Sequence, residues 1–235
     1  MKKAMISTAR VMLKVEKMFD PKFIAGTLGN IKNEGVMGQF EETGGDGIKY
    51  CYQQCVNDCY EYNKYYSGKT ITNIGISEAR TFSDKVKKSE NEKNEKCTVK
   101  KRCILSEKDG TYLNAGDKCE AKFGIGIIQW TSYEKGNGIR KDGLLKAYED
   151  FKENNNNNNF PSKDECIKIE SKYLVDEMES KTYKIYDYWL ENGPHTPYDA
   201  GYIICTDFIG NTKSEAKKRG NYAEVIYAAM YNYID

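Results

Sequence analysis

Glu34 is the residue with the clearest potential for chemistry. It closes the segment 29–35 (GNIKNEG), which follows a stretch with helical spacing of apolar residues. The sequence therefore places Glu34 at the C-terminal end of an apolar helix, where the helix dipole and an apolar neighbourhood would both oppose ionisation. A carboxylic acid that stays protonated near neutral pH can donate a proton to a glycosidic oxygen. On composition and spacing alone, a lone glutamate is more often simply an exposed residue at a helix end, so its role depends on the residues that accompany it.

The composition excludes several other kinds of chemistry. The chain of 235 residues has one histidine, His195, in a Gly-Pro-His-Thr-Pro turn, which almost excludes a Ser-His-Asp triad or a multi-histidine zinc site. Thirty-six Lys and Arg against 35 Asp and Glu leave a net charge of +1, without the basic excess typical of nucleic-acid binding. No uninterrupted apolar stretch of about 18 residues occurs, so neither a membrane span nor a clear signal peptide is expected. No cofactor and no metal site are predicted.

The cysteines are concentrated in one part of the chain. Six of the eight lie in a single window: Cys51, Cys55, Cys59, Cys97, Cys103 and Cys119. The first three recur every four residues, so a helix would place them on one face, from which they could reach the other three. Three disulfides in an oxidising, extracellular location are the favoured interpretation, with metal binding and reduced thiols as alternatives.

The elements that must position these groups are mostly helices. They are predicted over residues 10–19, 21–34, 139–151, 162–193 and 197–210, and from 214 onward. Helix-start signals precede three of them: Asp20-Pro21, the capping box of Ser162 with Glu165, and Thr196-Pro197. Gly26 and Gly29 lie inside the second helical pattern, which indicates close approach to another element.

The remaining segments are irregular. Residues 123–130 (FGIGIIQW) are short, apolar and interrupted by glycine, which is typical of a buried strand or turn. Residues 41–120 carry the cysteines and a charged run, and are predicted to be a Cys-rich insertion within one domain spanning residues 1–235. The predicted fold class is mainly α (α+β), with a small β or irregular region.

Several segments, in their order along the chain, resemble the phage-tail lysozyme family. They are the segment 29–35, the segment 123–131 (FGIGIIQWT), and Arg140 followed by Leu144-Leu145. Segments 169–177 and 219–227 resemble the two later helices of the family. This family belongs to the lysozyme-like superfamily, with goose-type lysozymes and lytic transglycosylases. The resemblance covers about residues 10–40 and 120–235. Gly35 departs from the serine usual after the glutamate, and the intervening span is longer and richer in cysteine.

The resemblance implies roles for four residues of a mainly α, lysozyme-like domain. Glu34 would be the general acid that protonates the leaving oxygen between N-acetylmuramic acid and N-acetylglucosamine. Gln129 would bind the sugar or order the site, from a strand whose glycines, such as Gly126, admit the glycan. Trp130 would be a stacking surface or an apolar wall beside Glu34, and a core tryptophan is an equally good interpretation.

A second carboxylate would decide the stereochemistry. An inverting hydrolase needs a base roughly 6.5 to 9.5 Å from the acid, and a retaining one a nucleophile about 5 to 5.5 Å away. Asp46, in a Gly-Gly-Asp-Gly turn, is the first candidate, with Glu41 and Glu42 behind it. If none serves, Glu34 alone would act as acid and then base and give an anhydro product, as in a lytic transglycosylase.

Three functions follow from the resemblance. The first is a muramidase that opens the cell wall locally for a phage tail, a conjugative element or an exported wall hydrolase. The second is a lytic transglycosylase that uses the same glutamate, and the third is a non-catalytic wall-binding or structural domain. The expected partners are peptidoglycan glycan strands and tail or conjugation-apparatus proteins, and the expected location is extracellular, at the cell wall or on a virion.

Overall fold

The computed structural model divides the chain into two compact units. One comprises Met1–Met37 with Ser162–Asp235, and the other Gly38–Pro161. The described residues are 2–15, 19–34, 36–40, 48–50, 65, 69–81, 103–104, 112–113, 120–121, 124–130, 140–155, 159–180 and 184–231. They are mainly helical with a few short strands, which confirms the predicted mainly α class. Within these ranges, no helix has the length and apolar character needed to cross a membrane.

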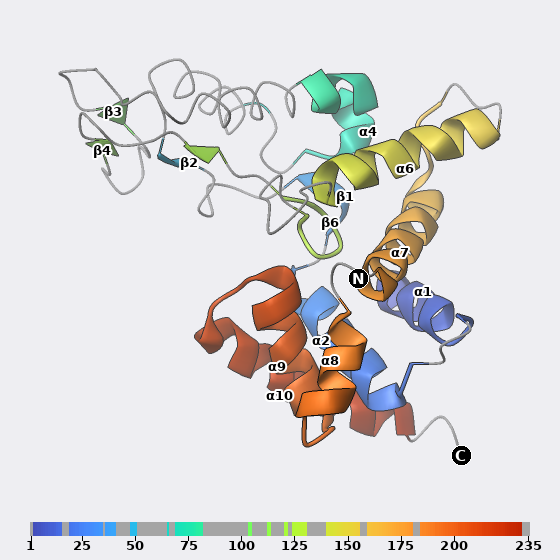
Figure 1. Cartoon of the computed structure of the whole chain (residues 1–235). Coiled ribbons are helices and arrows are strands. Elements are labelled where there is room, and N and C mark those ends of the chain that lie inside the picture. The colour runs from blue at the N-terminus through green and yellow to red at the C-terminus, as the bar shows by residue number, and fades with distance from the viewer. Residues whose placement is uncertain are drawn as a thin grey trace. The chain divides into compact units, whose positions relative to one another are not determined.

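The first unit consists of packed helices. They are α1 (Lys2–Met12), α2 (Pro21–Glu34), α7 (Lys163–Glu179), α8 (Ile185–Asn192), α9 (Pro197–Ile203), the π-helix η1 (Ile204–Ile209) and α10 (Lys213–Tyr231). Helices α2, α9 and α10 all contact one another, and α1 packs against α7 and α2 (Figure 1). The unit therefore surrounds α2, the helix that ends at Glu34.

Helix α2 begins as the sequence predicts. The side chain of Asp20 accepts a hydrogen bond from the backbone N–H of Lys22 at 2.7 Å, and Pro21 occupies the first helical position. A Cβ atom added to Gly26 would lie 2.5 Å from the Cβ of Ala200 in α9. A Cβ added to Gly29 would lie 2.8 Å from the carbonyl oxygen of Arg219 in α10. The predicted close approach at both glycines is therefore confirmed.

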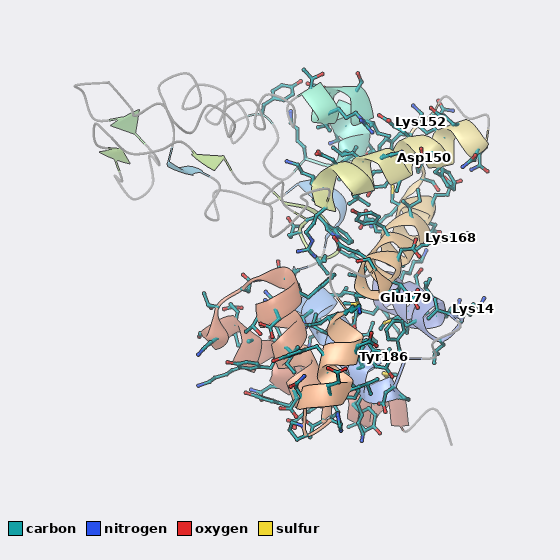
Figure 2. All side chains as sticks on the ribbon, viewed as in Figure 1. Lys14, Asp150, Lys152, Lys168, Glu179 and Tyr186 are labelled. Carbon is teal, nitrogen blue, oxygen red and sulfur yellow. The ribbon has the colours of Figure 1, made fainter. Side chains whose placement is uncertain are left out.

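An aromatic cluster fixes the start of α2 against α8. The ring of Tyr186, labelled in Figure 2, lies 4.7 Å from that of Phe19 and 4.8 Å from that of Phe23, both edge-on. Its hydroxyl accepts a hydrogen bond from the backbone N–H of Asp20 at 2.9 Å. Trp189, which is fully buried, packs on Phe23 with ring centroids 5.6 Å apart.

Two predicted helices have different bounds in the structure. The helix expected over 10–19 is α1, which begins at Lys2 and ends at Met12, because its buried face starts at Ala4 and includes Thr8. The single helix expected over 162–193 is two helices. The capping box of Ser162 is present and α7 ends at Glu179, after which Lys184 adopts a left-handed conformation (φ 36°) that no continuous helix allows. Both halves share one periodicity, which concealed the break.

The second unit combines short strands with helices. Its elements are β1 (Val36–Phe40, which spans the unit boundary), β2 (Ile48–Tyr50), α4 (Ile71–Ile74), a helix over 76–81, β3 (Cys103–Ile104), β4 (Tyr112–Leu113), β5 (Glu120–Ala121), β6 (Ile125–Gly126) and α6 (Arg140–Asn154). Strand β1 pairs with β6, β2 with β5, and β3 with β4, the last two pairs being antiparallel. Arg80 and Glu149 form an ion pair between the 76–81 helix and α6.

The predicted cysteine helix, the charged run and Asp46 lie outside the described residues, as does most of the 41–120 segment. The disulfides and the insertion therefore stay predictions. Among the cysteines whose side chains the structure describes, Cys166 and Cys205 are buried thiols.

Candidate active site

Glu34 is the last residue of α2, as predicted, and its side chain is 17% exposed. Its Oε1 atom accepts a hydrogen bond from Nδ2 of Asn211 at 2.7 Å. The same oxygen accepts a hydrogen bond from Nη2 of Arg219, with which Glu34 forms an ion pair. The carboxyl group therefore lies in a polar, charged neighbourhood rather than the expected apolar one. The reason is that Arg219 is 185 positions away in the chain, beyond the reach of any local pattern.

Arg219 is held firmly inside the first unit. It is only 2% exposed, and its Nη1 atom donates a hydrogen bond to Oδ1 of Asn30 at 3.1 Å. The Nδ2 atom of Asn30 in turn donates to the carbonyl oxygens of Gly26 at 2.9 Å and Gly201 at 3.0 Å. One network of hydrogen bonds thus joins α2, α9 and α10 directly behind Glu34.

The end of η1 brings Asn211 to Glu34. Gly210 adopts a left-handed conformation (φ 85°, ψ 25°) that terminates the π-helix. The backbone N–H groups of Gly210 and Asn211 both donate to the carbonyl of Cys205, the second at 2.9 Å. This turn directs the Asn211 amide towards Oε1. Short π-helical segments occur frequently at functional sites. The sequence predicted the helix end at Gly210 but not the role of the following asparagine.

The charges of Arg219 and Glu34 both influence the pKa of the Cys205 thiol. Burial raises its pKa from 9.0 to about 11, against the lowering effect of Arg219 and with a further raising effect of Glu34. The thiol is therefore uncharged at neutral pH, and Cys205 adds no charge to the surroundings of Glu34.

Three predicted substrate-binding residues meet in one turn of the second unit. Ile125 and Trp130 exchange backbone hydrogen bonds of 3.0 and 2.8 Å, which closes the turn between them. Gly126 (φ 84°) and Gln129 (φ 54°) both have left-handed backbones. The Nε2 atom of Gln129 donates to the carbonyl of Gly126 at 3.0 Å, whereas its buried Oε1 has no hydrogen-bond partner in the described part of the chain.

The other predicted site residues have different outcomes. Trp130 is only 1% exposed, which favours its interpretation as a core tryptophan over a stacking surface. Asp46, Glu41 and Glu42 lie outside the described residues, so the second carboxylate stays a prediction.

Comparison with known proteins identifies the class of this helical chain. The family model described as phage tail lysozyme matches residues 8–230, so the chain belongs to the phage tail lysozyme family. This confirms the resemblance seen in the sequence. No significant match was found among curated proteins or among solved structures. Membership of the family gives the chain a lysozyme-like role in cell-wall hydrolysis.

Proposed function

We propose that the protein is a muramidase that cleaves the bond between N-acetylmuramic acid and N-acetylglucosamine, with Glu34 as the general acid. The observation that carries the proposal is the geometry of Glu34. Its carboxyl group ends a buried helix, remains partly exposed, and is held through one oxygen by Asn211 and Arg219. A carboxyl group that is fixed through one oxygen, and whose second oxygen has no hydrogen bond within the described part of the chain, suits proton donation.

The proposed reaction begins with proton transfer from Oε2 of Glu34 to the glycosidic oxygen. The bond between this oxygen and C1 of N-acetylmuramic acid then breaks, and its electron pair stays on the leaving oxygen. Water adds to C1 and gives up a proton to the base, which leaves Glu34 ionised and the base protonated; proton exchange with solvent then returns both groups to their starting forms. Asp46 is the proposed second carboxylate, on the sequence argument alone.

We also propose that the turn containing Gly126 and Gln129 binds the glycan. The support is local: Gly126 and Gln129 both have left-handed backbones, and the part-buried amide of Gln129 is held by the hydrogen bond from its Nε2 atom to the carbonyl of Gly126. A turn fixed in this way can present its polar groups to a sugar in one geometry. Trp130 would then support this turn from the core rather than stack on the sugar.

The proposed setting is local opening of peptidoglycan by a phage tail, a conjugative element or an exported wall hydrolase. Family membership supports action on the cell wall or from a virion. Tail or conjugation-apparatus proteins are the proposed partners.

The test is digestion of purified Gram-positive peptidoglycan by the wild type and by Glu34→Gln, with the released fragments reduced by borohydride and analysed by mass spectrometry. Glu224→Gln, an exposed carboxylate of α10, is the matched control. Reducible N-acetylmuramic acid ends that vanish only in Glu34→Gln support the muramidase. Fragments with 1,6-anhydro ends would make the enzyme a lytic transglycosylase. Binding to the wall without Glu34-dependent release would make the protein a non-catalytic wall-binding domain.

A further inference from the structure

Arg219 is a buried arginine, and burial of a guanidinium is unfavourable unless its positive charge is paired and its N–H groups are hydrogen-bonded. Moving a charged group out of water costs free energy, which is offset only when the buried charge is paired and hydrogen-bonded. Arg219 is 2% exposed, and its Nε atom has no hydrogen-bond partner within the described ranges. Its Nη1 and Nη2 atoms are both engaged, with Asn30 and Glu34 respectively. The guanidinium is therefore oriented for two partners on α2, at the expense of its third nitrogen.

The two side chains that hydrogen-bond to Glu34 both donate to its Oε1 atom. Asn211 does so from the turn after η1, and Arg219 does so from α10. An oxygen that accepts two hydrogen bonds is the poorer place for a proton, because the donors occupy its lone pairs. The two oxygens of Glu34 are thus made different by residues that come from two other elements.

We propose that Arg219 and Asn211 are positioning residues that hold Oε1 of Glu34 as the acceptor and so assign proton delivery to Oε2. This inference rests on the proposed function of Glu34 as the general acid. Neither residue needs to touch the substrate in this role. They act through the rotation and the position of the carboxyl group, which fix the line of proton transfer.

Of the two positioning residues, Arg219 is held in place by a hydrogen-bond network of its own. Asn30 accepts from Arg219 and donates to carbonyl groups of α2 and α9. The positive guanidinium also lies beside the C-terminal end of α2, where the helix dipole favours a positive charge. Asn211, by contrast, is partly exposed at the end of η1 and contributes through one side-chain hydrogen bond.

The test compares Arg219→Met, Arg219→Lys and Asn211→Ala with the wild type on soluble, peptide-free glycan strands, with kcat and KM measured separately. We expect Arg219→Met to lower kcat about 100-fold, as for a misplaced catalytic group, with KM changed less than about twofold. Arg219→Lys should recover about tenfold of this loss, because a lysine keeps the charge but has no planar fork to serve Asn30 and Glu34 together. Asn211→Ala should lower kcat about tenfold with an unchanged Tm.

Asn211→Ala keeps the proposal testable if Arg219→Met does not fold, because Asn211 is outside the buried network. Unchanged kcat in Asn211→Ala, or a loss in the Arg219 variants that matches only their unfolded fraction, would overturn the positioning role and leave the proposed function intact. An effect on KM alone would likewise overturn it. A Glu34→Gln variant with full activity would refute the proposed function, and the positioning role with it.

Discussion

Replacing Gly26 with alanine tests how closely α2 must approach α9 to place Glu34. An added Cβ would lie 2.5 Å from the Cβ of Ala200 and 2.7 Å from both its carbonyl carbon and the backbone nitrogen of Gly201. Carbon atoms in contact are normally about 3.5 to 4.0 Å apart. The two helices would therefore have to separate by roughly 1 Å, and two of the three obstructing atoms are backbone.

Two effects of opposite sign determine how much Gly26→Ala changes the free energy of unfolding. Alanine in place of glycine inside a helix stabilises by about 1 kcal/mol. Overpacking of this kind costs about 1 to 3 kcal/mol, and a rigid backbone neighbour places Gly26→Ala at the upper end. The net loss of unfolding free energy is then about 2 kcal/mol, equivalent to a fall in Tm of roughly 4–8 °C for a chain of this size.

Urea denaturation and calorimetry of Gly26→Ala measure this loss. Asn221→Ala is the matched control, because it raises helix propensity at an exposed position of α10 and should be neutral or slightly stabilising. We also expect kcat of Gly26→Ala to fall, since Glu34 lies eight residues further along the same helix. A Gly26→Ala protein at least as stable as the wild type would refute the packing argument.

Three further predictions concern stability and the thiols. Ser162→Ala removes the acceptor of the capping box and should lower the unfolding free energy by about 1 kcal/mol in urea titrations. Hydrogen bonds with Ser162 lower the pKa of Glu165 below 4.5, so the contribution of this carboxylate to stability should be present at neutral pH and lost on acidification. An effect of Ser162→Ala that does not depend on pH would contradict this. Burial raises the pKa of Cys166 to about 12 and that of Cys205 to about 11, so both thiols should resist iodoacetamide in the native protein, and stability should fall as the pH rises above about 9; rapid native labelling of either peptide would contradict their burial. In denaturant without reductant, peptide mapping should find these two thiols labelled and the other six cysteines labelled only after reduction, as three disulfides require.

Local signals in the sequence were sufficient for much of the scaffold. Capping residues such as Ser162 and Thr196 accept hydrogen bonds from backbone N–H groups at the starts of α7 and α9, as their types predict. The glycines of α2 indicated a close helix contact correctly, because only a missing side chain allows two backbones to approach so closely. The break between α7 and α8 was missed, since it depends on the conformation of Lys184 and on the packing of Trp189 against Phe23.

The candidate site was predictable only in part, because some of its residues are neighbours in space but not in the sequence. Glu34 was predicted at the end of its helix because the helical pattern and its stop are local. The neighbours of its carboxyl group are not local, since Asn211 and Arg219 reach it from 177 and 185 positions away. The resemblance to the family included Arg219 in the terminal helix but gave it no role. The π-helical turn that orients Asn211 has no sequence signal comparable to a capping box.

Product analysis in ¹⁸O-labelled water tests the central claim most directly. Peptidoglycan is digested by the wild type and by Glu34→Gln at equal folded concentration, and the released muropeptides are weighed by mass spectrometry. A muramidase with Glu34 as its general acid incorporates one labelled oxygen at each new N-acetylmuramic acid end, and Glu34→Gln releases none of these fragments. Release of labelled ends by Glu34→Gln at the wild-type rate would contradict the account.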